Sequence, residues 1–215
     1  MSHPKYDLAR DQIDRAAGNQ QDLRDMLRHN PEARAVYSTA VRAVMGLLPY
    51  DFAKDRDNYA QLPDMVEWAE SIMTSRPADF PLQDGLNNLY MERWFILPRN
   101  EMANVYLHRI VRDDKDVMHD HPWDTTSIIL SGSYVEHTPE GSILREAGDR
   151  IDRRAEDAHR LALFDNKPVI SLFFTGPKIR DWGFHCPGGW VSWQDFTGGE
   201  HGGRGSTGRG CGEYA

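Results

Sequence analysis

The sequence is poor in cysteine and contains no long apolar run. Only Cys186 and Cys211 occur in 215 residues, which excludes a small fold built on several disulfides and suits a reducing cytosol. No apolar stretch approaches the ~20 residues of a membrane-spanning helix. The polar N-terminal residues lack the apolar core of a secretory signal. We therefore expect a cytoplasmic protein in which Cys186 is a buried structural residue.

The sequence also has no excess of basic over acidic residues. The chain has 25 Lys and Arg against 33 Asp and Glu, a net charge of −8. Non-specific binding to nucleic acid needs a basic face that contacts phosphates. We therefore do not expect nucleic acid as the main partner, and a small-molecule substrate is the better prediction.

The first third of the chain is predicted to be helical. Apolar residues recur every three or four positions over 35–48 and again over 64–73, the spacing of an amphipathic helix. No catalytic motif occurs there, so these apolar stripes are interpreted as packing surface. Residues 1–87 are predicted to form a helical N-terminal region packed on the remainder.

From residue 88 the apolar period changes from 3.6 to 2. Residues 91–112 are predicted to form two strands around a turn at 98–100. Five more strand-like pieces follow, separated by turn residues, at 125–130, 133–137, 159–164, 169–174 and 190–196. This spacing is typical of an all-β sandwich or barrel over 88–196. Residues 197–215 include eight glycines, which predicts a disordered tail.

Two histidines one residue apart begin one of these strands, in HDHPWDTTSIILSG. Alternate residues of a strand point to the same face, so His119 and His121 project together with Asp120 opposite. Pro122 favours an extended backbone at His121. The pair is able to present two imidazole nitrogens to one metal ion, although two ordinary histidines at a strand start remain the alternative.

The spacing around this pair resembles the cupin superfamily, whose motifs run G-x5-H-x-H-x3/4-E-x6-G and G-x5-P-x-G-x2-H-x3-N. Matches fall on His119, His121 and Gly132 in the first motif and on Gly148 and His159 in the second. The departures are Asp113 for the opening Gly, Thr125 for the Glu, and Arg154, Glu156 and Leu163 for the Pro, Gly and Asn of the second motif. The resemblance covers 88–196, and the segment is also similar to small uncharacterised cupin-like proteins of bacteria and phages.

The resemblance implies a double-stranded β-helix, or jelly-roll, barrel with its site in the barrel mouth. The implied metal ligands are His119, His121 and His159. Three neutral imidazoles with open positions suit Fe(II), Zn(II), Ni(II) or Mn(II), and Fe(II) is favoured because three-His cupins include the thiol dioxygenases. Thr125 removes the family's carboxylate ligand, while Asp124 lies one residue away from that position.

Three further residues are candidates for acid–base chemistry. His185 precedes a Pro-Gly-Gly turn of the kind that borders a barrel mouth. Tyr134 and Glu136 share one face of a strand and are expected to line the cavity, with Glu136 as a candidate general base. Arg109 is an anion hook if it points into the barrel and a solvated charge if it points out, and the outward position is preferred.

Three functions follow from these residues. The first is a metal-dependent oxygenase, of the dioxygenase type, acting on a small polar substrate. The second is an isomerase or epimerase of a sugar or nucleotide-sugar, using His185 with Tyr134 or Glu136. The third is a non-enzymatic ligand-binding or assembly module. The resemblance to cupins also implies a homodimer.

Overall fold

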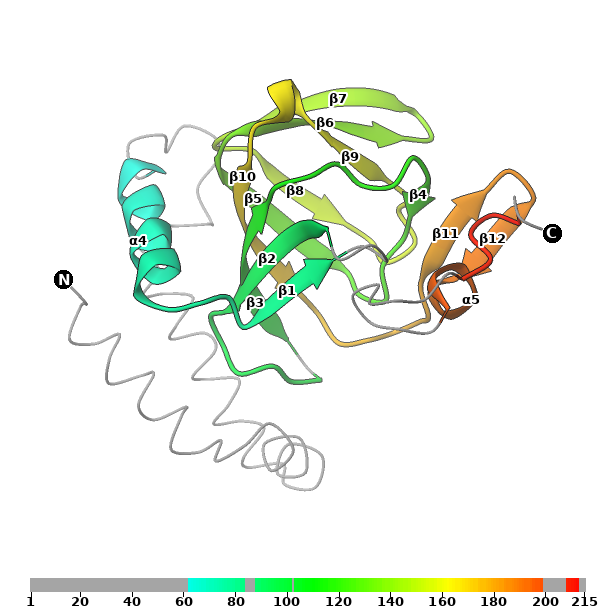
Figure 1. The fold of residues 1–215 in the computed structure, drawn as a ribbon, viewed down its shortest axis with the longest axis horizontal. Helices are drawn as coiled ribbons and strands as arrows, with labels where there is room; N and C mark the ends of the chain where they lie inside the picture. The colour runs from blue at the N-terminus through cyan, green and yellow to red at the C-terminus, as the bar shows by residue number, and fades with distance from the viewer. Residues whose placement is uncertain (1–61, 84–87, 102, 199–207, 213–215) are drawn as a thin grey trace.

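The computed structural model describes residues 62–83, 88–101, 103–198 and 208–212. Within these ranges the chain is mainly β, with antiparallel sheets wrapped into a barrel (Figure 1). The helix predicted over 35–48 lies outside the described residues. No helix within the described ranges is long and apolar enough to cross a membrane.

The barrel has two walls. One is a six-stranded sheet in the order β1-β2-β3-β10-β5-β8, and the other contains the three-stranded sheets β7-β6-β9 and β12-β11-β4. A β-bridge between His119 and His159 links these two smaller sheets. The strands are β1 (Phe80–Gln83), β2 (Leu89–Phe95), β3 (Asn104–Ile110), β4 (Met118–His119), β5 (Thr125–Ser131), β6 (Ser133–Thr138), β7 (Gly141–Glu146), β8 (Arg150–Arg153), β9 (Arg160–Leu163), β10 (Val169–Thr175), β11 (Gly183–Cys186) and β12 (Gly189–Ser192).

The chain crosses between the walls at Gly132, which separates β5 from β6. Gly132 has a φ of +82°, a conformation that side-chain-bearing residues rarely adopt. A Cβ atom placed there would lie 2.6 Å from the carbonyl oxygen of Pro168. Between β3 and β11 the chain passes repeatedly from one wall to the other, with the hairpin β6–β7 as the exception, and this is the arrangement of a jelly roll. The predicted cupin-like jelly-roll barrel is therefore confirmed.

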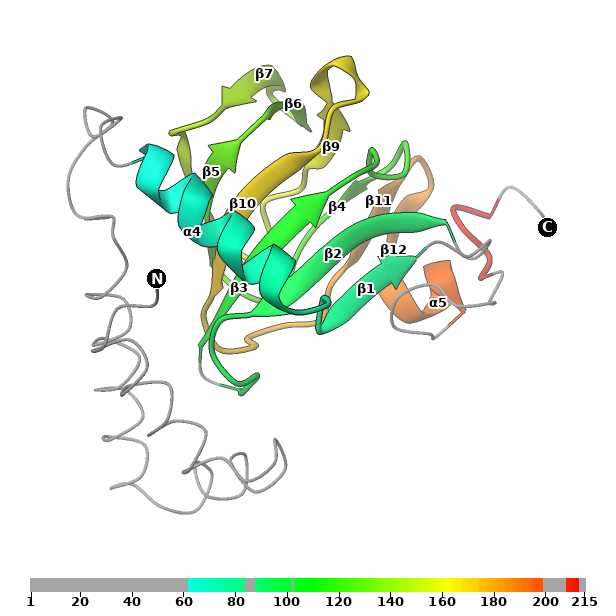
Figure 2. The same cartoon turned by 60° about the vertical axis from the view of Figure 1, so that its left-hand side comes forward.

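Helix α4 (Leu62–Ser75) covers the outer face of the six-stranded sheet (Figure 2). Met65 and Ala69 are fully buried against outward-facing residues of the sheet, including Trp94 and Leu107. These contacts explain the apolar spacing in residues 64–73 and confirm the helix predicted there.

The inside of the barrel changes from apolar to polar along its strands. On β3 the inward residues run from Ile110 through His108 and Tyr106 to Asn104, and the paired strand β10 repeats the change. The apolar part is a cluster made of Met91, Ile110, Ile129, Tyr134, Ile151, Leu161, Leu163 and Val169. The opposite end of the interior therefore carries buried polar side chains. Buried polar groups of this kind mark the candidate position of a functional site.

The prediction of a strand over 190–196 is partly wrong, since only the first part of this segment belongs to a strand, β12. It ends at Ser192, and the following residues form the short helix α5 (Trp193–Thr197). The hydroxyl of Ser192 accepts a hydrogen bond from the backbone N–H of Asp195 at 3.1 Å, and Gly198 ends the helix in a left-handed conformation. These two caps favour one helical turn over continued pairing.

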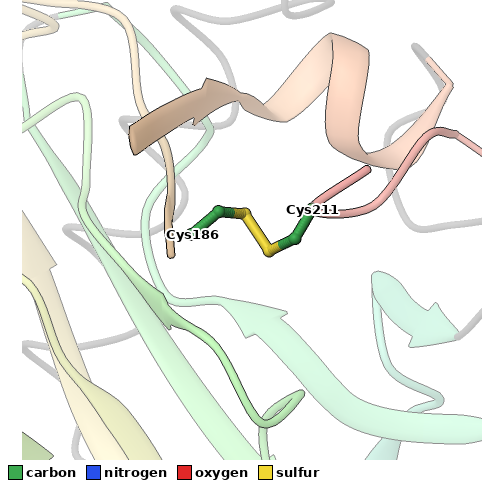
Figure 3. Close-up of a disulfide and its surroundings, with 2 residues drawn as sticks. All are labelled: Cys186 and Cys211. Carbon is green, nitrogen blue, oxygen red and sulfur yellow. A yellow bond between two sulfur atoms is a disulfide. The ribbon is translucent and has the colours of Figure 1, made fainter. Parts of the chain in front are cut away.

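The two cysteines form a disulfide, contrary to the prediction (Figure 3). Cys186 at the end of β11 is bonded to Cys211, with a Cα–Cα distance of 5.4 Å. The backbone around Gly208 also packs against Phe196. The predicted disorder is therefore wrong for residues 208–212, and the cysteines no longer argue for a reducing compartment. The distance between the two cysteines in the sequence did not exclude a disulfide. A loop of 25 residues closes at modest entropic cost.

We expect the disulfide to stabilise the fold measurably. In the chain-entropy account, closing a loop of this length contributes about 3 kcal/mol to the free energy of unfolding. Urea unfolding with and without dithiothreitol should show a loss of this order on reduction. A double variant, Cys186→Ser with Cys211→Ser, should show no response to the reductant, and equal stability of the oxidised and reduced wild type would contradict the expectation.

Candidate metal centre

Strand pairing brings the three histidines together from distant parts of the chain. His119 and His159 exchange two backbone hydrogen bonds, of 2.8 and 3.0 Å, at the bridge that links the smaller sheets. The backbone N–H of His121 donates to the carbonyl of Ala155 at 2.9 Å. The segments before β5 and before β9 are thus held side by side, and their histidines project into the barrel.

The side chains of His119, His121 and His159, here called the histidine cluster, converge on one point. One ring nitrogen from each lies within 4.8 Å of the other two. The Nε2 atoms of His121 and His159 are 2.9 Å apart, and the three ring centroids are separated by 5.0 to 5.2 Å. The structure therefore places all three predicted ligands as one group.

A buried carboxylate sets the orientation of one imidazole. Glu136 on β6 is 1% exposed, and its Oε1 lies 3.1 Å from Nδ1 of His159. Because a carboxylate oxygen accepts, Nδ1 carries the proton, and Nε2 presents its lone pair to the other histidines. A carboxylate behind a histidine is the usual outer partner of a metal-ligating imidazole.

The cluster favours neutral imidazoles. Burial lowers the pKa of His121 well below its usual value, and the neighbouring His119 and His159 lower it further. Burial likewise lowers the pKa of His159, followed by the positive charge of Arg153. At neutral pH both rings are therefore unprotonated, which is the state that binds a metal. Three convergent nitrogen donors, with the oriented tautomer of His159 among them, fit a divalent metal ion.

Glu136 is the predicted general base, and its contacts favour another role. Its carboxylate receives a hydrogen bond from Arg145 Nε at 2.8 Å and another from Arg153, besides its contact with His159. Tyr134 is 2% exposed and lies beside Arg153, and burial raises its pKa. A carboxylate held by two guanidinium groups is a weak base, so Glu136 is placed to orient His159.

His185 lies away from the histidine cluster. On β11 its neighbour Phe184 pairs with His119, so His185 points to the opposite face of the sheet. There its side chain is 42% exposed, and its Nε2 is 3.2 Å from Oδ2 of Asp120. The predicted acid–base residue is therefore not brought together with Tyr134 and Glu136.

Asp120, which the sequence placed opposite the histidine pair, is 1% exposed and anchors this region. Its carboxylate accepts from the backbone N–H of Gly183 at 2.7 Å and from Trp190 Nε1 at 2.9 Å, and it pairs with Arg180 at 2.8 Å. These contacts fasten the segment carrying His119 and His121 to the hairpin β11–β12. Asp120 had no assigned role in the sequence because all its partners lie 60 or more residues later.

Asp124 and Thr125 lie at and beside the position where the cupin motif has a carboxylate ligand. Asp124 Oδ1 accepts a hydrogen bond from the backbone N–H of Ala155 at 2.9 Å, so it braces a backbone turn. Thr125 is buried, and its hydroxyl has no hydrogen-bond partner among the residues that the structure describes. Neither residue joins the group of ligand atoms formed by the histidine cluster.

Arg93 is an interior arginine that we did not predict, whereas the position of Arg109 was predicted. Arg109 points outward, the orientation that we favoured, and its guanidinium pairs with Glu92 at 2.8 Å. On the neighbouring strand β2, Arg93 points inward instead, where its Nε donates to His108 Nε2 at 2.9 Å. The period-2 pattern of β2 was the available signal, because Arg93 alternates with the outward Trp94.

Comparison with known proteins yields structural neighbours only. No protein-family model matches the chain, and no curated protein sequence matches it. A conserved uncharacterised protein with a double-stranded β-helix domain from Klebsiella pneumoniae is similar at 17% identity, covering 51% of this chain and 88% of its own, with a TM-score of 0.38. A cupin superfamily protein from Desulfitobacterium hafniense has 17% identity, covers 40% of this chain and 77% of its own, and has a TM-score of 0.35.

A cupin domain from Bordetella pertussis has 18% identity, covers 44% of this chain and 95% of its own, and has a TM-score of 0.34. These neighbours are double-stranded β-helix or cupin proteins, like the family that the sequence motifs resemble.

Proposed function

We propose that this protein binds one divalent metal ion through His119, His121 and His159 and acts as a metal-dependent oxygenase on a small polar substrate. The observation that supports the metal site is the convergence of three imidazoles, one of them oriented by Glu136. Fe(II) is the preferred metal in this proposal, and Zn(II), Ni(II) and Mn(II) are the alternatives.

The surroundings of the histidine cluster favour chemistry shielded from water. Aromatic rings line it, with Phe173 at 6.1 Å and Trp123 at 6.4 Å from the His121 ring, and Phe184 at 6.0 Å from the His119 ring. Three protein ligands leave coordination positions open for substrate. Bound there, Fe(II) would supply oxygen activation, whereas Zn(II) would supply Lewis-acid polarisation. The chain's part is to orient the ligands and to exclude water.

The isomerase or epimerase alternative has less support. It requires an acid–base pair facing one substrate, and His185 lies on the opposite face of its sheet from His119. Glu136 is engaged by two arginines. The third alternative, a non-enzymatic ligand-binding or assembly module, would show no turnover, and the homodimer stays a prediction.

Metal analysis tests the proposal directly. Protein purified without a His tag and reconstituted anaerobically should retain about one equivalent of divalent metal after gel filtration, because three histidine donors converge once per chain. The Fe(II)-loaded form should then consume oxygen when screened with small polar compounds, and the Zn(II)-loaded form should not. Failure to retain any divalent metal would refute the metal site, and oxygen-independent turnover would refute the oxygenase.

A further inference from the structure

Strand β7 has one edge that no other described strand pairs with. It ends the sheet β7-β6-β9 and lies at the rim of the molecule (Figure 1). All of its residues except Arg145 are exposed. A free strand edge presents a row of backbone N–H and C=O groups that the strand of another chain is able to bond. The edge of β7 is therefore a candidate interaction surface.

The other edge strands have features that discourage pairing with another chain. Each of β1, β8 and β12 is four residues long. Pro81 lies within β1, and three of the four residues of β8 are charged. Short length, proline and charge are the usual protections of a sheet edge. By contrast, β7 has six residues, no proline and no bulge in its pairing with β6, so its edge is open to a partner.

Apolar side chains occupy both faces of β7. Ile143 is 45% exposed and Leu144 is 46% exposed. Because paired residues share a face and successive residues alternate, Ile143 lies on the face of Glu136, its partner on β6. Leu144 lies on the opposite face with its own partner, Val135. A strand added to this edge would cover both apolar side chains at once, whereas a partner on one face would cover only one of them.

We propose that β7 pairs with β7 of a second copy of this chain, antiparallel and across a two-fold axis at Leu144. An axis perpendicular to the sheet keeps every residue on its own face, so it must pass through a residue and not between two. With the axis at Ile143, Glu140 of one copy would face Glu146 of the other. With the axis at Arg145, that residue would face itself. Like charges directly opposite destabilise strand pairing, and only the axis at Leu144 avoids them near the middle of β7.

This register is also complementary in polarity on the outer face. Glu146 of one copy faces Ser142 of the other, and the hydroxyl of Ser142 lies 2.7 Å from Nδ1 of His137. The exposed carboxylate is thus brought to a Ser–His pair and not to another carboxylate. Leu144 packs on Leu144 of the second copy.

The other face is complementary as well. There Ile143 of one copy faces Arg145 of the other, whose aliphatic stem covers apolar surface. The same surface serves both partners, so the contact closes at two copies and leaves no β7 edge free for further addition. This self-complementarity favours a second copy as the occupant over the strand of an unrelated protein.

Sedimentation of the full chain over a dilution series tests the dimer. An interface of one strand pair is small, so a monomer–dimer equilibrium is expected between roughly 1 mM and roughly 1 μM protein. Leu144→Lys places two ammonium groups opposite each other at the axis and should weaken the dimer by more than ~100-fold. The matched control is Ile179→Lys, which changes an exposed apolar residue in the loop between β10 and β11. It should leave the dimer constant within about twofold of wild type.

Both positions are exposed, so both variants should keep the wild-type circular dichroism spectrum, and a change in association is then not a loss of fold. Three outcomes would overturn the proposal: a wild type that is monomeric throughout the series, a dimer that Leu144→Lys leaves intact, or a dimer that Ile179→Lys weakens equally.

Cysteine cross-linking tests the register. Cys186 and Cys211 are paired in a disulfide, so an added cysteine supplies the reactive thiol. A short bis-maleimide should join Leu144→Cys into a covalent dimer, because residue 144 faces its own copy. Ser142→Cys should stay uncross-linked, since its two copies would lie about 14 Å apart along the strands. Absence of cross-linking in Leu144→Cys, or equal cross-linking of the two variants, would refute the axis at Leu144.

Discussion

Replacing His159 with Ala should weaken Zn(II) binding by more than ~100-fold. The loss of an outer partner of a metal ligand typically lowers metal affinity 10- to 100-fold, and His159 is itself one of the three proposed ligands. Removing it leaves two imidazoles that lie on one short segment, and it also leaves Glu136 without its histidine contact. Competition against a chromophoric chelator measures the change.

His137→Ala is the matched control for this variant. His137 also lies in the β6–β9 sheet, but its Nδ1 contacts the hydroxyl of Ser142 at an exposed position. Its removal should leave Zn(II) affinity within about twofold of wild type. Both variants should keep the wild-type circular dichroism spectrum, so that a loss of metal is not a loss of fold. Unchanged Zn(II) affinity in His159→Ala would show that the histidine cluster is not the metal site.

Replacing Glu136 with Gln should have the largest effect on stability. The carboxylate is 1% exposed and faces two guanidinium groups and one imidazole. Gln has the same shape but no charge, so Arg145 and Arg153 would remain beside a neutral amide. Breaking a buried ion pair by removing one partner typically costs 3–5 kcal/mol. We therefore expect the free energy of unfolding of metal-free protein, measured with urea, to fall by about 3 kcal/mol or more.

The same variant should also bind Zn(II) about 10- to 100-fold more weakly, because the oriented tautomer of His159 is lost. The control is Glu92→Gln, which breaks the half-exposed pair with Arg109 on the outer face. An exposed pair of this kind contributes at most about 1 kcal/mol, and Zn(II) binding should not change. A metal-free Glu136→Gln protein as stable as wild type would show that the buried charges are compensated in another way.

Two of the proposed metal ligands were predictable as a pair because they follow a local rule. His119 and His121 share a face by strand alternation alone, and Gly132 stands where the chain needs a positive φ and a close approach to Pro168. The period-2 segments also correctly indicated most of the strands. Several short strands were missed, among them β1, β7 and β11, and α5 was predicted as a continued strand. A few residues carry too little periodicity to reveal a short strand or to outweigh helix capping.

The wrong predictions about the site concern two things: which face of a strand a residue occupies, and which side chains from distant segments it contacts. Cys186 meets Cys211, and Asp120 meets Arg180 and Trp190, through contacts between distant segments. Glu136 was rightly placed in the interior, but its two arginines were not foreseen, and they change its chemistry from base to positioning group. His185 was assigned to the mouth from its turn, whereas the pairing of β11 with β4 turns it to the other face.

The sequence by itself determined the β class of residues 88–196, the helix over residues 64–73 and the two histidines of one strand face, since periodicity acts between neighbours along the chain. Only the tertiary structure decided that His159, 38 residues after His121, completes the cluster with Glu136 behind it. The tertiary structure alone also decided that Arg93 faces the interior beside His108. These neighbours are set by strand pairing across the barrel, and pairing between strands leaves no periodic signal in the sequence.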